Sequence, residues 1–423
     1  MKYSVVTFGC RVNQADSLGF EEDLRKAGAT SAPLEDADLV VINTCSVTAT
    51  ADQGARQTIR RVARENPGAR IVVTGCYATR RPDEVAALSN VIRVVTNDDK
   101  PRLLPIVADS LGVAGVPTTA ARFGDGDGAC GAAIEPGVAG RTAYTLRVQT
   151  GCAEPCAYCI IPTTRGRPRS VPPDAVVAEA ERVSTAGFKE IALTGVHLGS
   201  YGRDLIPSSS LIGLLGALEG RGKPSLFRIS SLEPMDCTEE VVSLVAASDC
   251  FAPHFHLPLQ HASDRMLAAM RRPYTIEQYA ALVGRIRETM PDASIGSDVI
   301  VGFPGETDRD FDQLTSYLAD SPLTHVHVFP YSDRPGTVAS GMSGKVNGAV
   351  VRERARRVRE VGLGLAAAFR DSQIGRVHRG LTLEDGSLVV TGNYLKLRIP
   401  PGRPRNEWVT VRVSGAGALA EIC

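Results

Sequence analysis

The chain contains the segment Gly151-Cys152-Ala153-Glu154-Pro155-Cys156-Ala157-Tyr158-Cys159-Ile160-Ile161-Pro162, in which three cysteines are spaced C-x3-C-x2-C. Thiolates bind soft metals, and this spacing lets one loop surround a single metal site. Structural zinc normally takes four protein ligands, and no fourth cysteine or histidine follows closely. Three thiolates on a four-iron cluster leave one iron open for a further ligand. The segment therefore favours such a cluster, with structural zinc as the alternative.

This cysteine segment follows the first of six expected strands that alternate with helices. The strands are expected at residues 144–149, 190–194, 226–230, 254–257, 293–301 and 325–329. The helices between them are expected at 174–186, 211–218, 239–247, 276–290 and 308–318. Six such units predict an α/β fold with a partial (β/α)6 barrel, whose chemistry lies at the mouth formed by the loops after the strands.

The N-terminal part also alternates strands with helices, which predicts a doubly wound parallel sheet. Strands are expected at 3–7, 38–42, 70–74 and 91–95, and helices at 15–27 and 51–65. Cys10, Cys45 and Cys76 each lie just past the carboxyl end of a strand. Those ends share one edge of the sheet, where ligands gather. We therefore expect a second three-thiolate cluster, with three unrelated buried thiols as the alternative.

The C-terminal part has a charged helix at about 352–370 and then short strands at 381–384, 388–391, 395–399 and 408–413. Short strands of this kind predict a small β-barrel, a fold that commonly binds nucleic acid. From residue 373 onward the sequence contains seven lysines and arginines and four acidic residues, so this part is basic. The expected domains are residues 1–112, a linker at 113–141, residues 142–371 and residues 372–423.

Composition sets further limits. The 423 residues include 47 basic and 47 acidic side chains, so the chain is not a protein that coats nucleic acid indiscriminately. It shows neither a signal peptide nor an apolar run of membrane length, so we expect a cytoplasmic protein without a membrane partner. In that compartment its ten cysteines are expected to be metal ligands or buried thiols rather than disulfides.

Three segments around the N-terminal cysteines resemble the methylthiotransferase family. They are residues 7–14 (TFGCRVNQ), 43–48 (NTCSVT) and 73–78 (VTGCYA). The cysteine segment is similar to the cluster motif of the radical S-adenosylmethionine (SAM) superfamily, and residues 392–397 (GNYLKL) resemble the signature of the tRNA-binding TRAM domain. The methylthiotransferases add a methylthio group to tRNA adenosine or to a ribosomal protein side chain.

Residues 9–14, 56–68 and 160–167 look most similar to the branch that modifies N6-threonylcarbamoyladenosine beside the tRNA anticodon. The resemblance implies a radical SAM enzyme that methylthiolates C2 of this adenine and uses two [4Fe-4S] clusters and SAM. Within the family, isopentenyladenosine in tRNA or an aspartate of a ribosomal protein is an alternative substrate. Outside it, the alternative is a zinc-stabilised RNA-binding protein without catalysis.

The resemblance also implies roles for individual residues. Cys152, Cys156 and Cys159 are expected to hold the cluster at which SAM is cleaved, and Cys10, Cys45 and Cys76 to hold an auxiliary cluster. The expected SAM contacts are Tyr158 at the adenine, Gly195 near the amino group, Glu233 at the ribose or the substrate, and Gly302 and Pro304 along the adenosine. His197, His256 and His261 are expected to be structural, as a single histidine beside a strand usually is.

The expected partners are tRNA and a reductant protein such as flavodoxin or ferredoxin. Arginine guanidinium groups suit phosphate recognition, and several basic residues lie in loops near the expected barrel mouth or in the C-terminal part. The residues expected to contact RNA are Arg165, Arg167, Arg169, Arg272 and Lys396.

Overall fold

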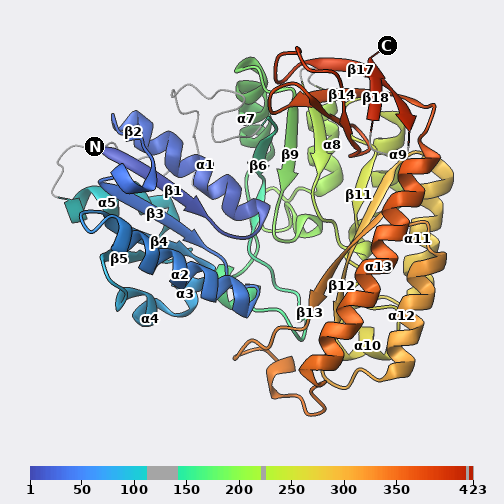
Figure 1. Ribbon diagram of the computed structural model, residues 1–423, viewed down its shortest axis with the longest axis horizontal. Helices are drawn as coiled ribbons and strands as arrows, with labels where there is room; N and C mark the ends of the chain where they lie inside the picture. Colours follow the sequence, from blue (N-terminus) through green and yellow to red (C-terminus); the bar gives the residue numbers. More distant parts are fainter. Residues whose placement is uncertain (112–141, 221–224, 416–418, 423) are drawn as a thin grey trace.

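The computed structural model describes residues 1–111, 142–220, 225–415 and 419–422. Figure 1 shows three units in chain order: an N-terminal sheet, a central set of strands with helices outside it, and a small C-terminal barrel. The expected linker at 113–141 lies outside the described residues. Among the described residues, no helix combines the length and the apolar character that a membrane crossing requires.

The N-terminal unit is a five-stranded parallel sheet with the strand order β2-β1-β3-β4-β5. Its strands are β1 (Lys2–Thr7), β2 (Thr30–Ser31), β3 (Leu39–Thr44), β4 (Arg70–Gly75) and β5 (Val91–Val95). Its helices are α1 (Arg11–Lys26), α2 (Ala49–Glu65), α3 (Cys76–Arg80), α4 (Pro82–Ala86) and α5 (Leu103–Leu111), with 3-10 turns η1 (Leu34–Asp36) and η2 (Lys100–Arg102). The pairing confirms the predicted doubly wound sheet and adds the short edge strand β2.

The central strand β3 of this sheet is buried along its whole length. Because successive side chains of a strand point to opposite faces, Val40 and Ile42 pack against α2, while Leu39 and Val41 pack with Phe20 of α1. A strand covered by helices on both faces has no solvent side, so its sequence is continuously apolar rather than alternating.

The central unit contains six parallel strands in two three-stranded sheets, β6-β9-β10 and β11-β12-β13. The strands are β6 (Tyr144–Arg147), β9 (Glu190–Thr194), β10 (Leu226–Ile229), β11 (His254–His256), β12 (Ser294–Val301) and β13 (His325–Pro330). A bridge between Phe227 and Phe251 links the two sheets beside β10 and β11. This arrangement confirms the predicted partial (β/α)6 barrel.

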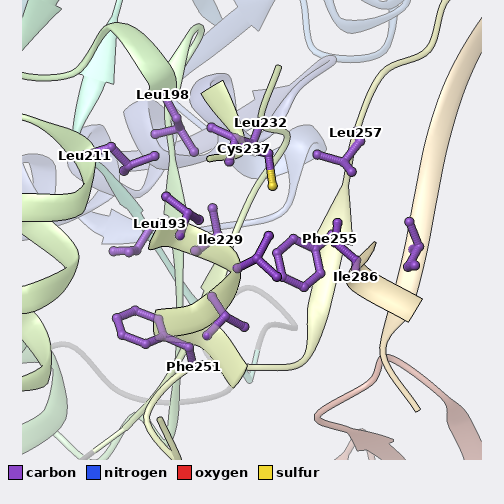
Figure 2. Packing of buried hydrophobic residues seen from close by; sticks show 14 of the residues in the cluster. Leu193, Leu198, Leu211, Ile229, Leu232, Cys237, Phe251, Phe255, Leu257 and Ile286 are labelled. Carbon is purple, nitrogen blue, oxygen red and sulfur yellow. The ribbon is translucent and has the colours of Figure 1, made fainter. Parts of the chain in front are cut away.

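Helices surround the central strands on the outside (Figure 1). They are α7 (Pro173–Thr185), α8 (Leu211–Glu219), α9 (Glu239–Ala247), α10 (Asp264–Ala269), α11 (Ile276–Thr289) and α12 (Asp308–Asp320), with 3-10 turns η5 (Leu198–Ser200), η6 (Pro234–Asp236) and η7 (Ala339–Gly341). Figure 2 shows side chains of this core, among them Leu193 of β9, Ile229 of β10 and Phe255 of β11. Burying one such side chain contributes ~1.5–3 kcal/mol, so the core holds the strand ends, and the loops after them, in fixed places.

The long helix α13 (Gly348–Ser372) packs along β13 and leads to the C-terminal barrel (Figure 1). The barrel strands are β14 (Val377–Leu383), β15 (Leu388–Thr391), β16 (Lys396–Arg398), β17 (Trp408–Gly415) and β18 (Leu419–Ile422). They close in the order β14-β15-β16-β18-β17, with Val409, Val411 and Val413 of β17 facing the interior. The predicted small β-barrel is confirmed, and β18 is a fifth strand that the sequence pattern did not indicate.

Arg228 of β10 connects the central barrel to the C-terminal one. Its Nη1 donates a 2.8 Å hydrogen bond to the carbonyl of Gly392, and its guanidinium lies 4.8 Å from the ring centre of Tyr394. Glu190 of β9 holds the same guanidinium through a 2.9 Å contact with Nε. The GNYLKL segment therefore fixes the C-terminal barrel on the central one.

Candidate active site

The N-terminal cysteines lie together at the carboxyl edge of the first sheet, as the sequence predicts. Cys10 follows β1, Cys45 follows β3 and Cys76 follows β4, and the charges of Cys10 and Cys76 act on Cys45. Gly9 has φ +88°, and a Cβ there would lie 2.6 Å from Sγ of Cys45. Only glycine therefore lets the loop of Cys10 approach Cys45 so closely.

Buried amides hold these cysteine loops. Nδ2 of Asn13 donates to the carbonyls of Phe8 (2.8 Å) and Thr44 (2.9 Å). Nδ2 of Asn43 donates to the carbonyl of Asn13 at 2.9 Å. Because each donor joins loops that are distant in sequence, the network fixes the cysteines relative to one another before any ligand binds.

Backbone hydrogen bonds hold the two ends of the C-x3-C-x2-C segment together. A short antiparallel pair, β7 (Gln149–Thr150) and β8 (Arg169–Ser170), flanks it, and the amide of Cys152 donates to the carbonyl of Gly166 at 3.0 Å. Gly151 has φ +77°, and a Cβ there would overlap the backbone of Arg167. The loop is therefore clamped at its base while its three cysteines are half-buried.

Gln149 connects this loop to the loop after β9. Its Nε2 donates to the carbonyls of Thr150 (3.0 Å) and Gly151 (2.8 Å). Its Oε1 accepts from the amides of Val196 and His197, both at 2.9 Å. The sequence gives no motif for this role, and only its fully buried amide in the structure reveals it.

His197 and Arg272 contact the cysteines directly. His197 bonds to Oδ2 of Asp236 at 2.8 Å and also to Cys152, and although burial alone would lower its pKa, these two partners raise that pKa to about 10. Nη1 of Arg272 lies 3.3 Å from Sγ of Cys156, and the same guanidinium forms an ion pair with Glu233. These contacts are consistent with the structural role expected for His197 and place it beside Cys152.

Burial changes the acidity of the thiols. It raises the pKa of Cys45 and of Cys159 to about 12, so without a cation nearby both are neutral near pH 7. Burial also acts to raise the pKa of Cys76, but the charges of Arg165 and Lys100 outweigh it and lower that pKa. Cations bound at these places would displace protons from the thiols.

The two groups of thiols fit the iron–sulfur clusters that the sequence implies in ligand number and softness. Among the described residues, no three His, Cys, Asp or Glu side chains are gathered closely enough to hold one metal ion.

A cavity of about 180 Å³ lies between the two units, near both groups of cysteines. One wall is Val47 and Thr48, which follow Cys45 closely in sequence. The opposite wall comes from the barrel mouth and consists of Tyr158, Cys159, Ile160, Ile161, Gln260, Asp298, Ile300, Phe329, Pro330, Tyr331 and Ser332. The walls are largely apolar, so a planar ring bound there would be shielded from water.

The other residues expected to bind SAM have local structural partners. A Cβ on Gly195 would come within 2.7 Å of Leu198, so this glycine allows close packing. The carboxylate of Glu233 faces Arg272, as described above. Gly302 and Pro304 are buried and do not line the cavity. A Cβ on Gly302 would lie 2.4 Å from Val351, so this glycine lets α13 pack closely there.

Two of the five residues expected to contact RNA do not fit that role. The side chain of Arg165 is 2% exposed and that of Arg272 is 1% exposed, because both are bound by acidic partners inside the protein. Arg167, Arg169 and Lys396 are exposed, and Arg169 pairs with Asp98 at 3.2 Å. For these three residues the RNA contact stays a prediction.

Family models match both cysteine-bearing units. The model described as "Uncharacterized protein family UPF0004" matches residues 2–97, and the radical SAM superfamily model matches residues 146–318. The threonylcarbamoyladenosine tRNA methylthiotransferase MtaB of Aquifex aeolicus is 37% identical over 406 residues, which cover 94% of this chain and 96% of the relative. This chain belongs to the radical SAM tRNA methylthiotransferases, in the MtaB branch.

Other relatives agree with this placement. MtaB of Bacillus subtilis is 37% identical to this methylthiotransferase over 83% of this chain and 78% of its own length. The tRNA-2-methylthio-N(6)-dimethylallyladenosine synthase of Streptomyces coelicolor is 30% identical over 98% of this chain and 79% of its own length. Among solved structures, the radical SAM methyltransferase TsrM from Kitasatospora setae superposes with a TM-score of 0.57 at 17% identity, over 80% of this chain and 76% of TsrM, and shows the shared fold.

Proposed function

We propose that this methylthiotransferase adds a methylthio group to C2 of N6-threonylcarbamoyladenosine beside the anticodon of tRNA. The observation that carries the proposal is the cavity with Cys159 in one wall and the loop after Cys45 in the other. A base bound there would lie between the two groups of cysteines. The names of the MtaB relatives support this nucleoside over the isopentenyl one.

In this proposal each group of cysteines holds one cluster, Cys152, Cys156 and Cys159 at the barrel mouth and Cys10, Cys45 and Cys76 on the first sheet. When bound, a four-iron cluster and SAM at the barrel mouth supply hydrogen abstraction, and a second cluster supplies the sulfur for transfer. Arg272 donates to Cys156, and His197 contacts Cys152, so both orient the thiolates and offset their charge. Gln149 fixes the loop that carries these thiolates to its neighbour.

The protein would bind the target base apart from its neighbours in the anticodon loop. Unstacking costs least in a single-stranded loop, where Tyr158 and Phe329 offer aromatic surfaces in the cavity wall. Exposed Arg167, Arg169 and Lys396 would contact phosphates. Electrons would come from a reductant protein such as flavodoxin or ferredoxin, and the site of action would be the cytoplasm.

Nucleoside analysis of tRNA from a strain that lacks the gene tests the proposal. We expect the methylthio form of threonylcarbamoyladenosine to disappear and to return with the parent gene. The variants Cys156→Ala and Cys76→Ala should fail to restore it, whereas Cys250→Ala, a buried thiol outside both groups, should restore it. Persistence of the methylthio form in the deletion strain would show that the substrate is a different one.

A further inference from the structure

The short helix α6 (Ile161–Arg165) follows the C-x3-C-x2-C segment and packs against α3, which begins at Cys76. Nδ2 of Asn97 donates to the carbonyl of Thr164 at 2.7 Å and lies 3.7 Å from Sγ of Cys76. One element therefore runs from the cysteine group of the barrel to that of the first sheet. At the end of this element stands Arg165.

Arg165 belongs to the barrel by sequence, yet its guanidinium lies inside the N-terminal unit. Nη2 lies 2.5 Å from Oδ1 of Asn13 and 3.5 Å from Oδ2 of Asp16, and Nη1 donates to Oγ1 of Thr150 at 3.2 Å. Cys76 interacts with it too, through charge and a side-chain hydrogen bond. The same side chain thus contacts a cysteine of the first sheet and the base of the cysteine segment.

The buried charges around this contact do not balance. The carboxylate of Asp16 forms ion pairs with three cations, Lys100 at 2.6 Å, Arg147 at 3.0 Å and Arg165 at 3.5 Å. Lys100 and Arg165, both almost fully buried, share this one carboxylate, so their two positive charges exceed its negative charge by one. A buried excess charge is costly unless an anion lies nearby, and the candidate beside Arg165 is the thiolate of Cys76 with any cluster that it holds.

We propose that Arg165 is a positioning residue that fixes the two cysteine groups relative to each other and, together with Lys100, raises the reduction potential of the auxiliary cluster. The inference rests on the proposed function, because it requires a cluster at Cys10, Cys45 and Cys76. Net charge and hydrogen bonds to sulfur are among the properties that set such potentials. A fixed positive charge stabilises the reduced form, which carries one more electron.

The test uses the full-length chain with Cys152, Cys156 and Cys159 changed to alanine, so that only the auxiliary cluster assembles. The midpoint potential is measured by redox titration followed by electron paramagnetic resonance. We expect Arg165→Gln to shift it to more negative values. Arg165→Lys should shift it less, because it keeps the charge but loses the planar fork. Arg167→Gln, an exposed arginine of the same loop, should leave it unchanged.

A second measurement needs no cluster. Hydrogen–deuterium exchange of the metal-free chain should show faster exchange in α3 and α6 for Arg165→Gln than for Arg167→Gln. An unchanged midpoint potential in Arg165→Gln with the iron content of its parent, or equal exchange in both variants, would overturn the inference. If Arg165→Gln does not assemble the cluster, the midpoint potential of Arg165→Lys and the exchange rates of the metal-free variants test the inference instead. A parent that holds no iron would instead overturn the proposed auxiliary cluster and this inference together.

Discussion

Gln149 begins β7, just after the first barrel strand β6, and is almost fully buried. Its amide is bonded at both ends, so it determines how the cysteine segment sits against the loop after β9. Neither loop could be placed from sequence at this detail, because a glutamine carries no motif. The same holds for Arg165, whose acidic partner Asp16 lies 149 residues away in the chain. A sequence shows that a residue is charged, but it does not show which residue will pair with it inside the protein.

Gln149→Leu should destabilise the chain by ~2–4 kcal/mol, because it leaves the part-buried amide of Val196 and the buried amide of His197 without an acceptor. Urea unfolding of the metal-free protein measures the change. The matched control is Gln57→Leu on the exposed side of α2, which should change the free energy of unfolding by less than ~0.5 kcal/mol. Equal stabilities of the two variants would contradict the role given to Gln149.

At the scale of elements, the sequence predicts both cysteine groups because the position of a strand end follows from simple patterns. Apolar runs mark β1, β3 and β4, and parallel topology brings Cys10, Cys45 and Cys76 to one edge. The sequence does not predict the short strands β2 and β18, because two to four residues are too few to show an alternation of apolar and polar side chains. The cavity between the units is not predicted either, because it depends on how the N-terminal sheet and the barrel pack against each other.

The helix α13 offers a prediction about backbone freedom. Gly364 lies in its middle, is exposed, and has no atom within 4 Å of the place where a Cβ would stand. Gly364→Ala should therefore raise the free energy of unfolding by ~0.5–1 kcal/mol, because alanine loses less chain entropy in a helix. A chemical unfolding curve measures this. A loss of stability would show that α13 is not a regular helix at this position.

At the scale of the whole molecule, buried arginines join the three units. Arg228 binds the C-terminal barrel, and Arg165 enters the first sheet beside Asp16. Arg334, after β13, donates to the carbonyl of Ser46 at 2.7 Å and to Oδ2 of Asp52 at 2.6 Å. Two barrel arginines therefore reach the N-terminal unit, one near Cys76 and one beside Cys45. Breaking such a buried pair leaves a charge uncompensated, which is costly.

The pairing of Asp16 predicts a pH dependence. Burial alone would raise the pKa of Asp16, but Lys100, Arg147 and Arg165 lower it well below the ordinary value of 3.8. The pairing therefore stabilises the fold fully above pH ~4, and this contribution is lost as the pH falls toward the lowered pKa. Urea unfolding should show Asp16→Asn much less stable than the parent at pH 7.

The difference between parent and Asp16→Asn should shrink as the pH falls below ~4, because the unfolded parent then takes up a proton that the variant cannot bind. Asp98→Asn is the matched control, since the carboxylate of Asp98 is 71% exposed beside Arg169. Its difference from the parent should be small at every pH. A pH-independent gap for Asp16→Asn would mean that Asp16 does not titrate as described.

The iron and acid-labile sulfide content of anaerobically reconstituted protein tests the central claim of two three-thiolate cluster sites. The parent should hold about eight irons per chain in two four-iron clusters. Changing Cys152, Cys156 and Cys159 to alanine should leave about four, and so should changing Cys10, Cys45 and Cys76. Zinc in place of iron, or a triple variant that keeps the full iron content of the parent, would contradict the account.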